Sequence, residues 1–190
     1  PGPAVRGLLS PPDYHYRRLI TDAVRAVTAV RSLPGVDPAR TAVVGNSQGG
    51  GLALAVAGLV GDLPAVLVTA PFLCGIRRSL ELTAAGPYGE ISAYLSVRRG
   101  SEETAYRTLS YVEGVSFARR AQAPAHFGTG LRDTVCPPSG VYAAFNRYGE
   151  LSGGGHSCKE IHAYPFNGHE GGEAEQVRRQ LSWLDSQLAH

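Results

Sequence analysis

The sequence predicts an α/β fold with a mostly parallel sheet. Two observations support this: short apolar runs at 41–44 and 65–69 flank a helix-like run at 50–59, and a Gly-x-Ser-x-Gly pentapeptide at 45–49 joins the first run to that helix. A strand, a helix and a strand at this spacing form a crossover unit with parallel strands. The 190 residues, 43% of them hydrophobic, suffice for one domain with a sizeable core.

An amphipathic helix is predicted first, over residues 13–33. Its apolar positions recur every three or four residues: Ile20, Ala23, Val24, Val27 and Val30. Pro34-Gly35 ends this helix, and Asp37-Pro38 turns the chain into the strand at 41–44. The helix at 50–59 is rich in alanine and leucine, so we expect it to be buried.

The alternation of strands and helices is interrupted at 72–121, which predicts an inserted helical segment. Its helices are expected around 91–98, 102–112 and 116–121. The sheet resumes with strands at 125–128 and 160–164, separated by a helix at 139–148. A last helix follows, with four apolar residues on one face: Val177, Leu181, Leu184 and Leu188.

Composition argues against several classes of function. The 18 basic and 16 acidic residues are interspersed, so there is no stripe of positive charge for nucleic acid. No stretch approaches the roughly 18 consecutive apolar residues of a membrane span, and the first residues lack a signal-peptide pattern. Three cysteines, Cys74, Cys136 and Cys158, are an odd number without paired spacing, which argues against a disulfide framework and a zinc site.

Ser47 is the candidate nucleophile. It lies at the centre of the pentapeptide, on a predicted tight turn between strand and helix, which is the nucleophile elbow of α/β hydrolases. A serine hydroxyl needs a histidine to accept its proton, and the histidine needs a carboxylate to hold its tautomer. In a parallel sheet these groups meet at the carboxyl ends of the strands, so we expect both partners in loops that follow strands.

Asp133 is the carboxylate that meets this condition, because it lies a few residues after the strand at 125–128. Asp62 follows a helix, and Asp185 lies inside the last helix.

His169 is the histidine that meets it, because it follows the strand at 160–164. The five others fit less well, since they precede that strand, lie in predicted elements or end the chain: His156, His15, His126, His162 and His190. Ser47, Asp133 and His169 also follow the hydrolase chain order of nucleophile, acid and base.

Seven segments carry a more specific signal: 14–18, 22–27, 45–50, 71–74, 107–111, 130–139 and 164–172. Together they resemble the acetyl xylan esterase and cephalosporin-C deacetylase family, carbohydrate esterase family 7 of the α/β hydrolases. The resemblance runs from about Gly7 to the last helix. The Gly-x-Ser-Gln-Gly elbow and the His-Glu pair at 169–170 are signatures of that family.

The resemblance implies a serine carboxylesterase that deacetylates small acetylated alcohols, such as xylooligosaccharides and cephalosporin C, with no metal or organic cofactor. It implies that Ser47 is the nucleophile, Asp133 the acid and His169 the base. The backbone N–H of Gln48 is expected to be one oxyanion donor, and Glu170 to have a structural role. The family also implies a cytoplasmic homohexamer, with no membrane or nucleic-acid partner.

Family members carry further strands and an Arg-Gly-Gln motif before the position of Gly7, and this chain contains no methionine, even at position 1. We therefore expect residues 1–190 to be a single, N-terminally truncated domain: the C-terminal portion of the α/β-hydrolase fold, from the nucleophile strand onward. Truncation would remove a second oxyanion donor and expose the sheet edge beside Ser47. The isolated polypeptide is then expected to be poorly stable and weakly active.

Two other interpretations stay open. A prolyl-oligopeptidase-type serine peptidase shares the elbow and the chain order, and it would cleave aminoacyl-proline substrates rather than acetyl esters. Alternatively, an inactive or assembly-dependent fragment would act only as a binding module, through its exposed sheet edge. In that case a fluorophosphonate probe would not label Ser47 in a folded sample.

Overall fold

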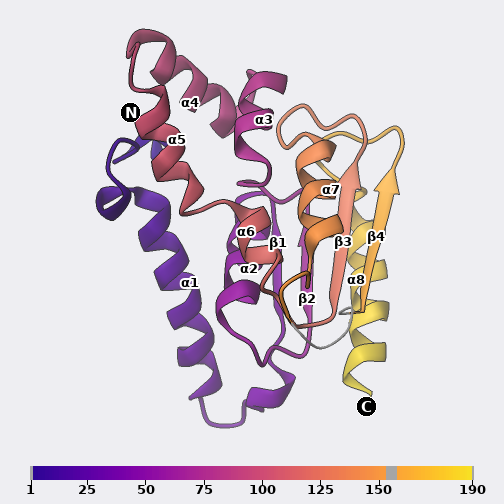
Figure 1. The fold of residues 1–190 in the computed structure, drawn as a ribbon. Helices are drawn as coiled ribbons and strands as arrows, with labels where there is room; N and C mark the ends of the chain where they lie inside the picture. The colour runs from indigo at the N-terminus through magenta and orange to yellow at the C-terminus, as the bar shows by residue number, and fades with distance from the viewer. Residues whose placement is uncertain (1, 153–157, 190) are drawn as a thin grey trace.

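The computed structural model describes residues 2–152 and 158–189, built around a four-stranded sheet (Figure 1). The strands are β1 (Val43–Asn46), β2 (Val66–Thr69), β3 (Ala125–Gly130) and β4 (Lys159–Tyr164). The helices are α1 (His15–Arg31), α2 (Gln48–Leu59), α3 (Ile76–Leu82), α4 (Gly86–Val97), α5 (Glu102–Ser110), α6 (Gly114–Ala118), α7 (Pro138–Arg147) and α8 (Glu173–Leu188). Short 3₁₀ helices cover Pro3–Val5, Pro11–Asp13 and Pro38–Arg40.

The sheet is parallel throughout, in the order β1-β2-β3-β4, which confirms the predicted architecture. Val43 pairs with Val66, Val66 with Ala125, and Ala125 with Lys159, so the four strands begin at the same level. Strands β2 and β3 are buried along their whole length. Because the strands are parallel and in step, their carboxyl ends form one edge, where the following loops lie side by side.

Alternation along the strands sends side chains to two faces that are covered by different helices. Val66, Val68 and Phe127 belong to a core cluster that includes residues of α2 and α7. Leu67 points the other way and packs with Trp183 of α8. Figure 1 shows α8 behind β3 and β4, on the opposite side from α7.

The packed face of α8 combines two glutamines with Trp183, and it is displaced from the apolar stripe that the sequence suggested. Val177 and Leu181 are 52% and 57% exposed, whereas Gln176 and Gln180 are buried. The reason lies in the sheet beneath. Gln180 Nε2 donates to Thr69 Oγ1 at 3.2 Å, and the hydroxyl of Tyr164 donates to Gln176 Oε1 at 2.9 Å.

Helices α3 to α6 fill the segment where the sequence predicted helices around 91–98, 102–112 and 116–121. The unpredicted one is α3, whose N-terminus is stabilised by a distant residue. The carboxylate of Glu113 accepts hydrogen bonds from the N–H groups of Gly75 at 2.8 Å and Ile76 at 2.9 Å. Burial raises the pKa of Glu113, and these backbone hydrogen bonds oppose that effect. A cap supplied from so far along the chain has no local sequence signal.

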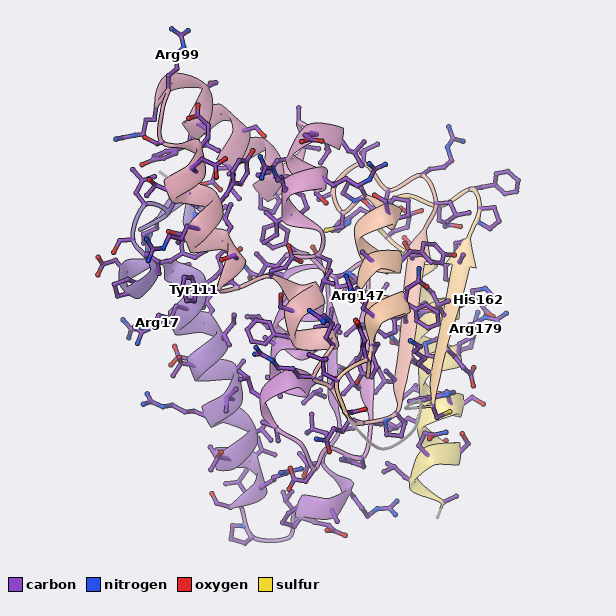
Figure 2. All side chains as sticks on the ribbon, viewed as in Figure 1. Arg17, Arg99, Tyr111, Arg147, His162 and Arg179 are labelled. Atoms are coloured by element: carbon purple, nitrogen blue, oxygen red, sulfur yellow. The ribbon has the colours of Figure 1, made fainter. Side chains whose placement is uncertain are left out.

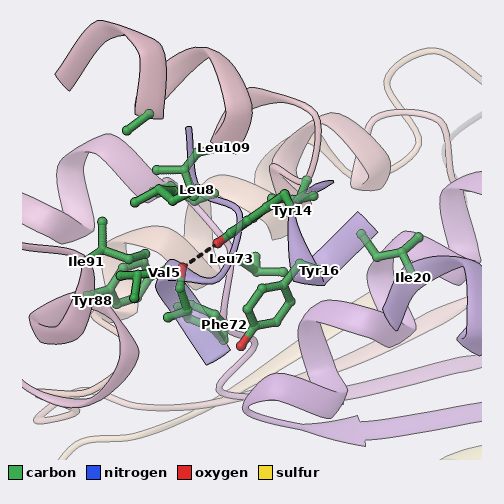
Figure 3. Close-up of a cluster of buried hydrophobic side chains, with 14 of the residues drawn as sticks. Val5, Leu8, Tyr14, Tyr16, Ile20, Phe72, Leu73, Tyr88, Ile91 and Leu109 are labelled. Atoms are coloured by element: carbon green, nitrogen blue, oxygen red, sulfur yellow. Dashed lines mark hydrogen bonds between the residues drawn. The ribbon is translucent and has the colours of Figure 1, made fainter. Parts of the chain in front are cut away.

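The N-terminal residues pack over the helical segment. Val5, Leu8 and Tyr14 join Tyr88 and Leu109 in a buried cluster (Figure 3). The Tyr14 hydroxyl donates to the Ala4 carbonyl oxygen at 2.9 Å. This cluster ties the start of α1 to α4 and α5.

Strand β1 is the outer strand of the described sheet on the Ser47 side. An apolar groove of about 380 Å³ lies between it, α1 and α2. Val44 is 72% exposed and Val30 is 42% exposed beside this groove. An apolar edge next to the Ser47 strand is what the sequence predicted.

Basic side chains are dispersed over the surface (Figure 2). The labelled arginines Arg17, Arg99, Arg147 and Arg179 come from separate parts of the chain. Arg147 pairs with Glu150 at 2.8 Å, and Arg179 pairs with an acidic residue of its own helix. In the part of the chain that the structure describes, no helix combines the length and the apolar character needed to cross a membrane.

Candidate active site

Ser47 occupies a strained turn between β1 and α2. Its φ of 53° and ψ of −115° place a non-glycine residue at positive φ, a conformation that costs about 1–3 kcal/mol and persists only where neighbours enforce it. Two backbone hydrogen bonds do so here. The N–H of Ser47 donates to the Thr69 carbonyl, and the N–H of Phe72 donates to the Ser47 carbonyl, both at 2.9 Å. The elbow is therefore held by the end of β2 and the loop after it.

The glycines of the elbow have different roles. A Cβ atom at Gly45 would lie 2.1 Å from the carbonyl oxygen of Gly49, and one at Gly50 would lie 3.0 Å from the Cα of Pro71. These two glycines permit close backbone approach. A Cβ atom at Gly49 itself would meet no described heavy atom within 4 Å. Of the two glycines in the pentapeptide, Gly45 is therefore required by the close backbone approach, and Gly49 is not.

His169 lies between Ser47 and Asp133. Its Nε2 is 2.9 Å from Ser47 Oγ, and its Nδ1 is 2.9 Å from Asp133 Oδ2. The three residues come from different elements: the turn after β1, the loop after β3 and the loop after β4. The parallel sheet brings them together because all three positions follow the carboxyl ends of strands.

Asp133 is held in one orientation. Its side chain is buried, and its Oδ1 accepts the N–H of Val135 at 2.7 Å and the N–H of Cys136 at 2.8 Å. Its other oxygen, Oδ2, is left for His169. A carboxylate in this position accepts a hydrogen bond from a protonated Nδ1. The other ring nitrogen, Nε2, is then unprotonated and can accept the proton of the Ser47 hydroxyl.

The aspartates and histidines that did not meet the strand-end condition lie away from Ser47, or outside the described residues. Asp62 pairs with Arg31 at the surface, at 2.8 Å, and Asp185 is in α8. Three of these histidines occupy two strands and the first position of α1: His126, His162 and His15. The remaining two, His156 and His190, lie outside the described residues.

Gln48 is the first residue of α2. The backbone N–H groups in the first turn of a helix have no partner within the helix. The Gln48 N–H lies directly after Ser47, where an oxyanion donor is expected. The side chain of Gln48 donates from Nε2 to the Tyr16 hydroxyl at 2.8 Å. Sequence reasoning assigned no role to Tyr16.

Glu170 supports the loop that carries His169. Its Oε1 accepts the Asn167 side-chain amide and the Gly168 backbone N–H, each at 3.0 Å. Backbone hydrogen bonds from Glu170 itself and Gly168, followed by the Asn167 amide, lower the pKa of this carboxyl. The contacts suit the structural role expected for Glu170.

Cys136 lies beside the site and is a poor nucleophile. Burial raises the pKa of its thiol to about 12, the nearby Asp133 adds to this, and the interaction with Ser47 only partly opposes it. Since the thiolate is the reactive form, Cys136 is inert near neutral pH. Cys74 is likewise buried, Cys158 is exposed, and all three cysteines are free.

The described residues contain no group of three or more histidine, cysteine, aspartate or glutamate side chains arranged to hold a metal ion. At the carboxyl edge, the described residues bring together a hydroxyl, an imidazole and a carboxylate in hydrogen-bonded sequence. This is the order required for nucleophilic attack by serine.

The parallel sheet, the strained serine turn and the loops after β3 and β4 define an α/β hydrolase. The family model for acetyl xylan esterase (AXE1) matches residues 1–187. The chain therefore belongs to the acetyl xylan esterase family, carbohydrate esterase family 7.

Individual relatives agree with this assignment. The chain is similar to the acetyl xylan esterase of Paenibacillus sp. R4, with 39% identity, a TM-score of 0.90, and coverage of 98% of this chain and 57% of that one. For acetyl xylan esterase 1 of Thermoanaerobacterium sp. JW/SL YS485 the identity is 32%, the TM-score 0.84, and the coverage 97% and 58%. The acetyl esterase Axe7A of Xylanibacter ruminicola is 29% identical over 187 residues, which are 98% of this chain and 40% of that protein.

The chain thus spans about half the length of these relatives. Solved peptidases also align, at 13% to 19% identity, and this likeness shows the fold alone.

Proposed function

We propose that the protein is a serine carboxylesterase that removes acetyl groups from small alcohols. The proposed substrates are acetylated xylooligosaccharides and the 3′-acetoxymethyl group of cephalosporin C. The observation that carries the proposal is the position of His169, 2.9 Å from both the Ser47 hydroxyl and the Asp133 carboxylate, in a chain of the acetyl xylan esterase family.

The first half of the reaction transfers the acetyl group to the enzyme. Ser47 Oγ attacks the acetyl carbonyl carbon while His169 Nε2 accepts the hydroxyl proton. The Gln48 N–H donates to the oxyanion that forms, and the Asp133 carboxylate stabilises the positive charge on His169. The carbon–oxygen bond to the alcohol then breaks, and His169 gives its proton to the departing alkoxide.

The second half hydrolyses the acetyl-serine. His169 accepts a proton from water, whose oxygen attacks the acetyl carbonyl carbon. The bond to Ser47 Oγ breaks, His169 returns the proton to that oxygen, and acetate leaves. No step requires a cofactor.

The test compares two neighbouring side chains. Ser47→Ala is expected to abolish release of acetate from p-nitrophenyl acetate and acetylated xylooligosaccharides, because it removes the attacking oxygen. Cys136→Ala is expected to retain activity, because that thiol is protonated. Equal loss of activity in both variants, with both folded, would overturn the assignment.

The peptidase interpretation predicts a different substrate with the same nucleophile. An acetyl ester and an aminoacyl-proline p-nitroanilide, assayed side by side on one sample, distinguish the two. Faster turnover of the anilide would favour the peptidase.

The proposal extends to parts of the protein beyond this chain. Because the relatives are longer, we propose that the second oxyanion donor lies outside residues 1–190 and that these residues are part of a single domain. A cytoplasmic homohexamer is the assembly proposed from the family. Light scattering of the purified protein measures its mass directly, and a monomer would contradict the hexamer.

A further inference from the structure

The oxyanion donor at Gln48 is oriented by groups on the other side of its peptide bond. The N–H of Gln48 and the carbonyl of Ser47 belong to one peptide unit. Because that unit is planar and trans, the two groups point in opposite directions. The Ser47 carbonyl accepts the N–H of Phe72 at 2.9 Å and the N–H of Gly51 at 3.0 Å. Groups that fix Phe72 and Gly51 therefore also fix the direction of the Gln48 N–H.

Tyr16 contacts this arrangement at two points. Its hydroxyl accepts the hydrogen bond from Gln48 Nε2 at 2.8 Å. Its ring lies edge-on to Phe72, with centroids 5.6 Å apart, as Figure 3 shows in the same cluster. One side chain of α1 thus contacts both the residue that carries the donor N–H and the residue that holds the opposite carbonyl.

The position of Tyr16 makes it a rigid support. The residue is 1% exposed, whereas Gln48 is exposed, so the hydrogen bond ties a solvent-facing amide to a buried group. Tyr16 is itself packed against Tyr14, with ring centroids 5.7 Å apart. Burial raises the pKa of Tyr16, so its hydroxyl is un-ionised near neutral pH.

We propose that Tyr16 is a positioning residue for the oxyanion donor of the esterase, and that it acts through the side chain of Gln48 and the ring of Phe72. This inference rests on the proposed function. Oxyanion stabilisation requires donors that are oriented before the charge develops, and a small loss of alignment lowers the rate without weakening substrate binding.

The test removes the hydrogen bond from either side. Tyr16→Phe deletes the hydroxyl and keeps the ring on Phe72, and Gln48→Met deletes the amide and keeps the backbone N–H. Each variant is expected to lower kcat about 10-fold, less than the 10²- to 10³-fold typical for loss of a whole donor, with KM unchanged. The double variant is expected to be no slower than either single one, because both substitutions break the same hydrogen bond.

Tyr14→Phe is the matched control. It also removes one buried tyrosine hydroxyl, which donates to the Ala4 carbonyl at 2.9 Å, away from the elbow. It is expected to lower the thermal midpoint and to leave kcat unchanged. Binding of methylboronic acid, whose tetrahedral adduct with a serine carries the oxyanion, should weaken about 10-fold in Tyr16→Phe and not in Tyr14→Phe.

Three results would overturn the proposal: an unchanged kcat in folded Tyr16→Phe, equal slowing in Tyr14→Phe, or independent, multiplying effects of Tyr16→Phe and Gln48→Met. The proposed function fails on a different result, retained esterase activity in Ser47→Ala. The two failures are therefore distinguishable.

Discussion

Replacing Asp133 by asparagine tests whether this carboxylate keeps His169 Nε2 unprotonated, as the proposed proton transfer requires. The two oxygens of Asp133 face different groups: Oδ1 accepts two backbone N–H groups at 2.7 and 2.8 Å, and Oδ2 faces His169 Nδ1 at 2.9 Å. An asparagine can satisfy both N–H groups only with its carbonyl oxygen. Its NH₂ group must then face His169.

That orientation reverses the tautomer of His169. An NH₂ group donates to Nδ1, so the ring proton moves to Nε2, and Nε2 can no longer accept the proton of Ser47. A wrong tautomer in a serine hydrolase of this type lowers kcat on the order of 10⁴-fold, which corresponds to about 5.4 kcal/mol of transition-state stabilisation. Stability should change little, because the volume and the two hydrogen bonds to Oδ1 are kept.

The assay is the acylation burst with p-nitrophenyl acetate, measured beside a thermal transition. Asp62→Asn is the control, since that carboxylate pairs with Arg31 at the surface and lies outside the site. A folded Asp133→Asn that keeps more than about a tenth of the wild-type burst rate would refute the role of Asp133 in setting the tautomer.

Three other predictions concern stability and reactivity. Gly45→Ala should destabilise the protein by about 3 kcal/mol or more, because its Cβ would lie 2.1 Å from a backbone oxygen. Gly49→Ala, whose Cβ would meet no described atom within 4 Å, should stay within about 1 kcal/mol of wild type. Denaturant unfolding measures both stabilities, and equal losses would contradict the different roles of the two glycines. Iodoacetamide at pH 8 should alkylate exposed Cys158 and spare Cys136, whose pKa is raised to about 12. Mass spectrometry of the peptides measures both reactions, and faster alkylation of Cys136 would contradict the prediction. Burial lowers the pKa of His126 below its ordinary value of 6.5, so the unfolded chain takes up the proton first as the pH falls. The free energy of unfolding should therefore fall below about pH 6.5, by at most about 1.4 kcal/mol per pH unit. The slope of unfolding free energy against pH should flatten in His126→Gln, and an unchanged slope would contradict this cause.

Much of the architecture was predictable from the sequence because it depends on local signals. Hydrophobic periodicity located the helix at 13–33 and the strands that became β1 to β4, with boundaries displaced by a few residues. The parallel arrangement followed from the strand–helix–strand spacing. Asp133 and His169 were identified by their place after strands, a rule that needs only the order of elements along the chain.

Contacts between distant residues were not predictable in this way. Helix α3 depends on the carboxylate of Glu113, 37 residues beyond Ile76. The packed face of α8 depends on Thr69, 111 residues before Gln180. Periodicity favours an apolar face, and only the polar groups that the folded sheet presents beneath α8 make its glutamine face the buried one.

The sequence alone thus determined a parallel α/β sheet with a serine on a tight turn and an aspartate and a histidine after later strands. The tertiary structure decided how those groups meet: His169 within 2.9 Å of two side chains, and Tyr16 against Gln48 across 32 residues. The physical reason is that turns and periodic elements are encoded by neighbouring residues. Hydrogen-bond distances between loops exist only once the strands have paired in register.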